Sequence, residues 1–192
     1  DRLWPAYENL EKISTLRGKT VGIPTGFSDL DKLTSGFRPG ELIILAARPS
    51  VGKTAFALNM AVGAAKQKMS VAIFSLEMGV DDLTQRILCS EAGISLTHVR
   101  NGELTSSDWQ RASDAIDAMS NYEISIDDSS SLNITELRAK ARRQLRNKEG
   151  QGIIFVDYLQ LMQPAKKNSE SRQVEIAEIS RGLKILAKDL QV

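Results

Sequence analysis

The sequence predicts an α/β fold in which a mostly parallel sheet is covered by helices on both faces. Short apolar runs alternate along the chain with stretches of helical pattern, and such runs are continuous in strands that are buried on both sides. A Gly-Lys-Thr triplet lies between one of these runs and a helical stretch, and acidic residues follow two others. Because ligands of open α/β sheets bind beyond the carboxyl ends of the strands, these polar residues indicate a site at that edge.

Residues 2–16 place apolar side chains at spacings of three and four, which predicts a short amphipathic helix ahead of the sheet. The expected strands are four apolar runs, at residues 42–46, 71–74, 123–126 and 153–156. The expected helices cover residues 55–67, 80–92, 107–119, 133–148 and 172–190. Asn133 and Glu136 form the sequence pattern of a capping box at the start of the fourth of these helices. Turn-forming residues are dense between residues 25 and 40.

The overall charge leaves the class of partner open. Lysine and arginine number 25 and acidic residues 24, so the net charge is +1, and a local basic patch is enough for nucleic-acid binding. No apolar run reaches the about 18 residues of a membrane-spanning helix, so no membrane partner is expected. The single cysteine, Cys89, excludes an internal disulfide and is expected to be a buried structural thiol in a reducing cytosol. His98 has no neighbouring ligand for a zinc site.

The Gly-Lys-Thr triplet ends a phosphate-loop pattern. The segment consists of Ala47, Arg48, Pro49, Ser50, Val51, Gly52, Lys53 and Thr54. It matches G-x-x-x-x-G-K-[ST] at every specified position except the first, where Ala47 replaces glycine. Backbone amides and the helix N-terminus form an anion site, Lys53 supplies a charge to the outer phosphates, and the Thr54 hydroxyl is a ligand for Mg²⁺. The alternative is a structural turn before a helix that Thr54 caps.

Two acidic residues follow expected strands and complete the predicted site. Asp157 ends the strand at 153–156, in the position of an aspartate that holds Mg²⁺. Glu77 follows the strand at 71–74, where a carboxylate can orient and deprotonate an attacking water. Taken alone, an acid in either position is more often a loop or cap residue than a functional one. With a phosphate loop present, the two together predict a catalytic site for ATP hydrolysis with Lys53 and Glu77 as catalytic groups.

Five segments of this chain together resemble the C-terminal domain of DnaB-type replicative helicases. They are residues 25–31 (TGFSDLD), 47–54 (ARPSVGKT), 74–78 (FSLEM), 157–162 (DYLQLM) and 178–184 (EISRGLK). This family also carries alanine at the first position of its phosphate loop, so Ala47 favours the resemblance. The resemblance covers nearly the whole chain and is more specific than the phosphate loop alone.

The resemblance implies a RecA-like core that assembles as a homohexameric ring around single-stranded DNA. ATP and Mg²⁺ are then expected between subunits, and the motor is expected to move 5′ to 3′ and unwind duplex at the replication fork. Primase and a helicase loader are the implied partners, and the bacterial cytosol or nucleoid the implied location. Residues 1–17 look like the linker helix that docks on the adjacent subunit, and residues 18–192 like the ATPase domain. An apolar stripe at 2–16 also fits packing on the chain's own core.

Three basic residues match a region that faces DNA in the family's ring: Lys166, Lys167 and Arg172. A solvated loop is the alternative for each of them. A second basic run, between Arg138 and Lys148, is interpreted as the solvent-facing side of a helix rather than as a DNA-binding surface.

The resemblance also predicts elements beyond Val192, namely a further strand with a glutamine sensor, another DNA-binding loop and an arginine finger. The chain is therefore expected to be truncated and nearly inactive by itself. A second class of function stays open. A RecA-like nucleotide-dependent switch or recombination-accessory ATPase shares the core fold without unwinding DNA.

Overall fold

A computed structural model describes residues 3–4, 7–8, 11, 22–145, 152–163 and 171–192. Within these residues the sheet has three strands in the order β2-β1-β3, and both pairings are parallel. The strands are β1 (Ser70–Ser75), β2 (Ile124–Asp127) and β3 (Gly152–Asp157). Every residue of the central strand β1 is buried. Ser75 pairs with Asp157, so the carboxyl ends of β1 and β3 lie level with each other.

The helices of the described residues confirm most of the expected ones. They are α2 (Ser28–Thr34), α3 (Lys53–Lys66), α4 (Val80–Ala92), α5 (Leu96–Asn101), α6 (Ser106–Met119), α7 (Ile134–Gln144) and α8 (Arg172–Leu190), with a short 3-10 helix η1 (Leu159–Leu161). The bounds of α4 and α8 agree with the sequence prediction. Helices α2 and α5 were not among the helices expected from the sequence. Both are short and bury no residue, so neither has the apolar periodicity that marks a longer helix.

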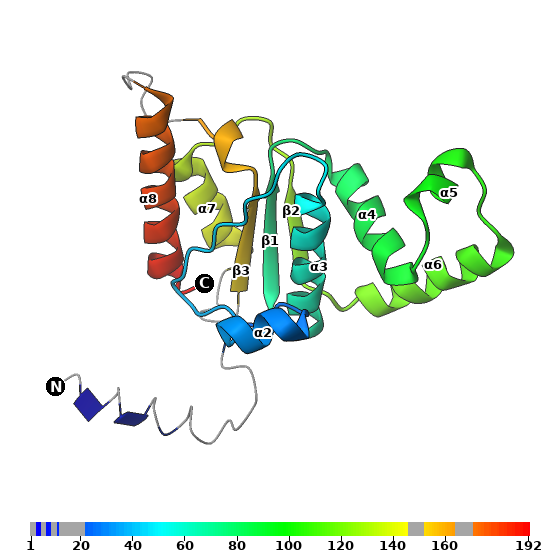
Figure 1. Cartoon of the computed structure of the whole chain (residues 1–192), viewed down its shortest axis with the longest axis horizontal. Coiled ribbons are helices and arrows are strands. Elements are labelled where there is room, and N and C mark those ends of the chain that lie inside the picture. Colours follow the sequence, from blue (N-terminus) through cyan, green and yellow to red (C-terminus); the bar gives the residue numbers. More distant parts are fainter. Residues whose placement is uncertain (1–2, 5–6, 9–10, 12–21, 146–151, 164–170) are drawn as a thin grey trace.

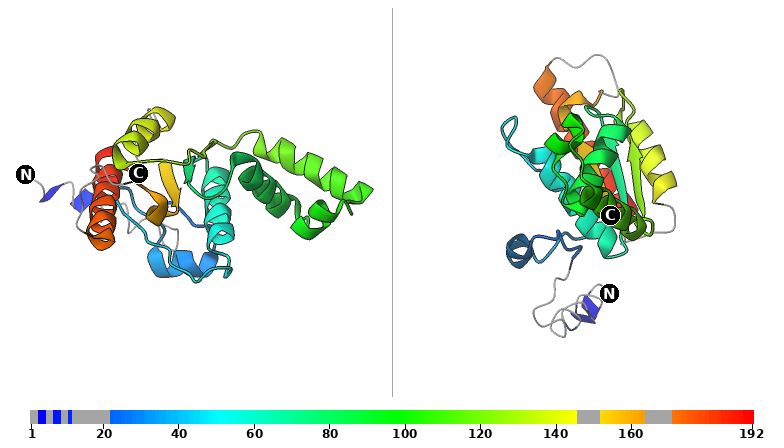
Figure 2. Two further views of the ribbon diagram at one scale, coloured as in Figure 1. Left: turned by 90° about the horizontal axis from the view of Figure 1, so that it is seen from above. Right: turned by 90° about the vertical axis from the view of Figure 1, so that its right-hand side faces the viewer.

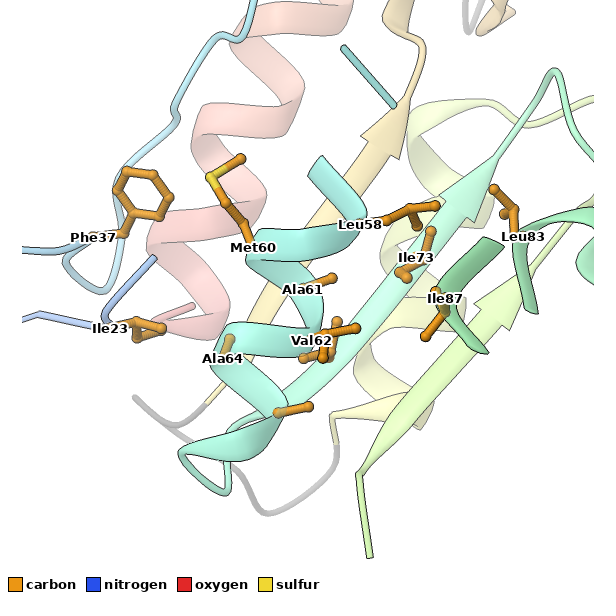
Figure 3. Close-up of a cluster of buried hydrophobic side chains, with 12 residues drawn as sticks. Ile23, Phe37, Leu58, Met60, Ala61, Val62, Ala64, Ile73, Leu83 and Ile87 are labelled. Atoms are coloured by element: carbon orange, nitrogen blue, oxygen red, sulfur yellow. The ribbon is translucent and has the colours of Figure 1, made fainter. Parts of the chain in front are cut away.

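Helices cover both faces of the sheet, as the continuous apolar strands predict (Figure 1). On one face Val71 and Ile73 of β1 pack in a cluster with α3 and α4. Figure 3 shows Ile73 grouped with Leu58 of α3 and with Leu83 and Ile87 of α4. On the other face the core is built by the following residues, most of them from β1, α7 and α8: Ala72, Phe74, Leu132, Leu137, Ala141, Leu145, Met162, Ile179, Leu183 and Leu186. Both faces of the central strand are therefore buried against helices.

A loop and a short helix pack against the middle of α3. The carboxylate of Asp31 accepts a hydrogen bond from the Thr25 amide at 2.8 Å, which closes the loop at residues 25–31. A Cβ on Gly63 of α3 would lie 3.0 Å from the carbonyl oxygen of Thr25, so glycine permits this close approach. The rings of Phe27 and Phe56 are 4.5 Å apart. The TGFSDLD segment therefore holds the helix that carries the phosphate loop.

Helices α4, α5 and α6 extend away from the sheet in both Figure 1 and the left view of Figure 2. Polar contacts join α4 to α3. Ser90 donates to the amide oxygen of Asn59 at 2.8 Å, and Lys66 forms an ion pair with Glu91 at 2.9 Å. The chain between β1 and β2 thus forms a lateral arm that is anchored on α3.

The Asp108 carboxylate at the start of α6 stabilises the folded protein in a pH-dependent way. The Asp108 carboxylate accepts hydrogen bonds from the amide (2.8 Å) and hydroxyl (2.7 Å) of Thr105, and Arg111 forms an ion pair with it. The Thr105 contacts, followed by Arg111, lower the pKa of Asp108 from 3.8 to about 2. Because the folded pKa is depressed, the stabilisation is present above pH 4 and is lost as the pH falls from about 4 to 2.

We therefore expect Asp108→Asn to lower the melting temperature at neutral pH and to be less harmful at low pH. The gap between wild type and variant should shrink as the pH falls from about 4 to 2, because the protonated wild type has lost the same charge. Thermal unfolding followed by circular dichroism at a series of pH values measures this gap. Asp117→Asn, an exposed carboxylate on the same helix, is the matched control. A gap that stays constant down to pH 2 contradicts the assignment.

The prediction of a strand at residues 42–46 is wrong, because this segment pairs with no strand among the described residues. This segment belongs to no helix or strand, and Ile43, Ile44 and Leu45 are exposed. A slot of about 590 Å³ separates it from β3, and α3 and α8 also line this slot. Ladder hydrogen bonds need a neighbouring strand within about 5 Å, so this apolar run, across the slot from β3, pairs with none of the described strands. Residues 42–46 are apolar as a strand would be, but their sequence does not show which segment lies beside them.

The amphipathic helix predicted at residues 2–16 lies mostly outside the described residues. Residues 3–4, 7–8 and 11 are helical and exposed, and the rings of Trp4 and Tyr7 stack with 5.7 Å between centroids. No helix among the described residues is long and apolar enough to span a bilayer.

Candidate functional site

The phosphate-loop segment forms an exposed turn that leads directly into α3. Ser50 and Gly52 both have a positive φ, at 64° and 105°. A side chain is strained at the φ of Gly52, although a Cβ there would meet no atom within 4 Å from the described residues other than its neighbours in the chain. Glycine is therefore required by the backbone conformation and not by crowding. The empty space beside it leaves the loop open to a ligand.

Helix α3 begins at Lys53 with its first amides available. The cap residue Gly52 supplies no side-chain hydrogen bond to the helix. The first helical hydrogen bond runs from the Phe56 amide to the Gly52 carbonyl at 2.9 Å. Amides at the start of a 14-residue helix attract anions, because they point outward and carry the positive end of the dipole. The loop and the helix end together form an anion cradle in the geometric sense, with backbone amides at the start of α3 beside an open loop.

Three of the predicted site residues meet at the carboxyl end of β3. The Lys53 ammonium lies 2.7 Å from Oδ1 of Asp157. The Thr54 hydroxyl donates to Oδ2 of the same carboxylate, also at 2.7 Å. The ammonium also lies 4.5 Å from the centre of the Tyr158 ring. The fold thus joins the phosphate loop to Asp157, 103 residues later than Thr54 in the chain.

Glu77 leaves the sheet at the same edge. The Leu76 amide donates to the carbonyl of Asp157 at 2.8 Å, one residue before Glu77. The buried hydroxyl of Ser75 bonds both the carbonyl (2.8 Å) and the amide (3.1 Å) of Met78. This turn holds the loop that carries Glu77, whose side chain is exposed. A carboxylate is therefore presented to solvent beside the strand end that carries Asp157.

The predicted DNA-binding residues are only partly described. Lys166 and Lys167 lie outside the described residues. Arg172 is exposed at the first position of α8, where it forms an ion pair with Glu175 and donates to the carbonyl of Gln160. Arg172 is thus held near η1, which follows β3.

The basic run on α7 agrees in part with a solvated helix face. Arg138 pairs with Asp189 of α8 at 3.0 Å, and Lys140 pairs with Asp127 of β2 at 2.6 Å. Arg142 and Arg143 are exposed. Arg138 and Lys140 therefore join the helix to neighbouring elements, which a reading of surface charge alone does not predict.

Two residues of the site were missed by sequence reasoning. Ser75 shapes the turn before Glu77, and Tyr158 places its ring beside Lys53. Serine is a common turn residue, but its side-chain bonds to the Met78 backbone three residues on are not indicated by the sequence alone. Nothing in the sequence indicates that the ring of Tyr158 faces a lysine from another element.

Cys89 and His98 have no part in this site. Cys89 is buried, as predicted, and burial raises the pKa of its thiol. His98 lies on α5 in the lateral arm. In the described parts of the chain no three His, Cys, Asp or Glu side chains gather as a metal-binding group.

A parallel α/β sheet whose phosphate loop opens a helix and meets a strand-end aspartate defines a class, the phosphate-loop nucleotide-binding proteins. The comparisons place the chain within that class. It belongs to the DnaB-like helicase C terminal domain family, whose model matches residues 22–192.

Relatives with named functions match the whole chain. It is 49% identical over 193 residues to "Replicative DNA helicase DnaC" of Bacillus subtilis (strain 168), and the match covers 100% of this chain and 42% of the relative. Identity to "Replicative DNA helicase DnaB" of Geobacillus stearothermophilus is also 49%, with the same coverage. The chain therefore spans less than half the length of these curated relatives.

Solved structures support the fold over the same span. The structure described as "ATPase Domain of G40P" has a TM-score of 0.92 and 35% identity, and the match covers 100% of this chain and 68% of that one. A second, "The Structure Of A DnaB-Like Replicative Helicase And Its Interactions With Primase", has a TM-score of 0.89 and 36% identity. It covers 97% of this chain and 45% of that chain. The expected RecA-like α/β fold is confirmed.

Proposed function

We propose that this chain is the ATPase motor domain of a replicative DNA helicase. In this proposal ATP is hydrolysed at the subunit interfaces of a homohexameric ring, which moves 5′ to 3′ on single-stranded DNA and unwinds duplex at the replication fork. The observation that carries the proposal is the meeting of Lys53 and Thr54 on the Asp157 carboxylate. The names of the two relatives cited above, both replicative DNA helicases, direct it towards DNA.

The phosphate loop is proposed to bind ATP through residues 47–54. The amides at the start of α3 hold the phosphates, and the empty space beside Gly52 admits them. Lys53 contributes a positive charge to the outer phosphates. Its side chain is only 27% exposed, so water screens this charge incompletely.

Thr54 and Asp157 are proposed to hold Mg²⁺. A hydroxyl and a carboxylate that already lie within 2.7 Å of each other are hard oxygen donors of the type that Mg²⁺ prefers. Because Mg²⁺ keeps several waters and phosphate oxygens as ligands, two protein groups are sufficient. When bound, the ion would neutralise charge on the phosphates.

Glu77 is proposed as the general base. Its exposed carboxylate leaves the sheet level with Asp157, on a loop that Ser75 holds in one conformation. A carboxylate in this place orients a water molecule towards the outer phosphate and accepts its proton.

The remaining assignments extend the proposal to partners. Lys166, Lys167 and Arg172 are proposed to contact the phosphates of single-stranded DNA, and residues 1–17 to be a linker helix ahead of an ATPase domain at 18–192. Primase and a helicase loader are the proposed protein partners, since one similar structure is described with primase. The bacterial cytosol or nucleoid is the proposed location.

DNA-stimulated hydrolysis tests the motor function against a nucleotide-dependent switch. Steady-state ATP hydrolysis is measured with and without single-stranded DNA, for this chain and for the full-length protein. We expect strong stimulation in the full-length protein and little in the isolated chain, because a motor site between subunits uses groups from both, and one arginine finger contributes about 10³–10⁵ in rate. If the full-length protein binds ATP but its rate of hydrolysis does not change with DNA, the motor function is contradicted and the nucleotide-dependent switch is favoured.

A further inference from the structure

We propose that Lys53 and Tyr158 close the metal position on Asp157 while the site is empty of nucleotide. A divalent cation then enters only together with phosphates that draw the Lys53 ammonium away. The inference rests on the proposed function, because it takes the Asp157 carboxylate to be a metal ligand. It goes further by assigning Lys53 a second role and Tyr158 a positioning role.

The first observation is that both oxygens of the Asp157 carboxylate are engaged. Oδ1 lies 2.7 Å from the Lys53 ammonium, and Oδ2 accepts the Thr54 hydroxyl at 2.7 Å. The Asp157 side chain is 16% exposed and that of Lys53 27%, so the pair is partly withdrawn from water. A metal ion approaching the carboxylate meets a positive charge already bound there. Because like charges repel more strongly where water is scarce, this arrangement disfavours the ion.

The second observation is the position of Tyr158. Its ring centre lies 4.5 Å from the Lys53 ammonium, within the range of a cation–π contact. Tyr158 follows Asp157 directly in the chain, so the carboxylate and the ring come from one backbone segment at the end of β3. A lysine side chain is long and flexible, and holding it in one place has an entropic cost. The Asp157 carboxylate and the Tyr158 ring together offset this entropic cost better than the carboxylate alone.

The third observation is the location of the anion cradle relative to this pair. Lys53 is the first residue of α3 and adjoins Gly52. Apart from the chain neighbours of Gly52, no atom of the described part of the chain lies within 4 Å of a Cβ placed there. Phosphates bound at this helix end bring a larger negative charge than one carboxylate to the same lysine. When the ammonium turns to them, Asp157 loses its counter-charge. A cation that arrives with the phosphates replaces it, so charge balance is kept throughout.

The test uses Mn²⁺ as the probe, counted by electron paramagnetic resonance in the absence of nucleotide. We expect wild-type protein to bind Mn²⁺ weakly at this site and Lys53→Met to bind it about tenfold more tightly or better, since a charged contact to Asp157 is removed. Tyr158→Leu should tighten Mn²⁺ binding by about two- to fivefold, the size of an exposed cation–π contact. Tyr158→Phe keeps the ring and is the matched control, with unchanged Mn²⁺ affinity.

Two further measurements separate the outcomes. Thermal unfolding shows that each variant is folded. Mn²⁺ binding in the presence of a non-hydrolysable ATP analogue, with and without Asp157→Asn, tests the metal position itself. If Asp157→Asn leaves this nucleotide-dependent binding intact, the metal is not held at Asp157 and the metal assignment of the proposed function fails. If Asp157→Asn abolishes it, yet neither Lys53→Met nor Tyr158→Leu tightens Mn²⁺ binding without nucleotide, the inference alone is wrong.

Discussion

Replacing Lys53 by alanine in the full-length protein is expected to reduce ATP hydrolysis by about 10²-fold or more while the fold survives. The contact of a charged donor with a phosphate contributes about 1.5–3 kcal/mol, and its effect on rate is greatest where the transferred phosphate gains charge. The fold should persist, because the polar contacts of the Lys53 ammonium are with Asp157 and Tyr158 of the same site and not with the buried core. Steady-state kinetics measures the rate of ATP hydrolysis, and far-ultraviolet circular dichroism shows whether the fold survives.

Lys66→Ala provides the control for that experiment. Lys66 is the last residue of the same helix, and its ion pair with Glu91 lies in the contact with α4 rather than at the phosphate loop. We expect its hydrolysis rate to stay near that of the wild type. Wild-type turnover in Lys53→Ala itself would show that residues 47–54 are not the phosphate-binding loop.

Glu77→Gln is expected to slow hydrolysis by about 10²–10⁴-fold and to leave Mg-ATP binding nearly unchanged. The amide has the shape of the carboxylate but cannot accept a proton from water. Binding should survive, because the groups that we propose contact phosphate and metal belong to α3 and the end of β3. Single-turnover hydrolysis and the affinity for a fluorescent ATP analogue are measured side by side.

Asp82→Asn, an exposed acid in the first turn of α4, controls for a general loss of negative charge near this loop. Its hydrolysis rate should stay close to wild type. A Glu77→Gln protein that loses binding and turnover in parallel would assign Glu77 a structural or metal-holding role in place of the general base.

Two parts of the site were predictable from the sequence: the phosphate loop, from its local pattern, and the edge that carries the two acids, from the direction of the strands. The sequence pattern predicts a phosphate loop at Gly52, Lys53 and Thr54, because a helical stretch continues from them. In the structure α3 begins at Lys53. Asp157 and Glu77 were placed at one edge because parallel strands end together, and the pairing of Ser75 with Asp157 agrees with that placement. These inferences needed no knowledge of which strands are neighbours.

Features that depend on the neighbour of a segment were not predictable. The apolar run at residues 42–46 has the composition of a strand, but pairing requires another strand at its side, and a slot lies there. The ring of Tyr158 and the ammonium of Lys53 meet through tertiary packing alone. In the same way, Arg138 and Lys140 have the composition of a solvated helix face, while their partners lie on α8 and β2.

The order of strands in the sheet has a consequence for the sequence of folding events. The arm of α4, α5 and α6 is held by local contacts, including the capping box at Thr105 and Asp108. The central strand instead pairs with segments that are synthesised much later, β2 and then β3. Closing long loops costs entropy before the contacts that reward it are made, so non-local pairing is slow. We therefore expect the junction of Thr54 with Asp157, across 103 residues, to form late in folding. A nascent chain that still lacks β3 is expected to form the helical arm before the site.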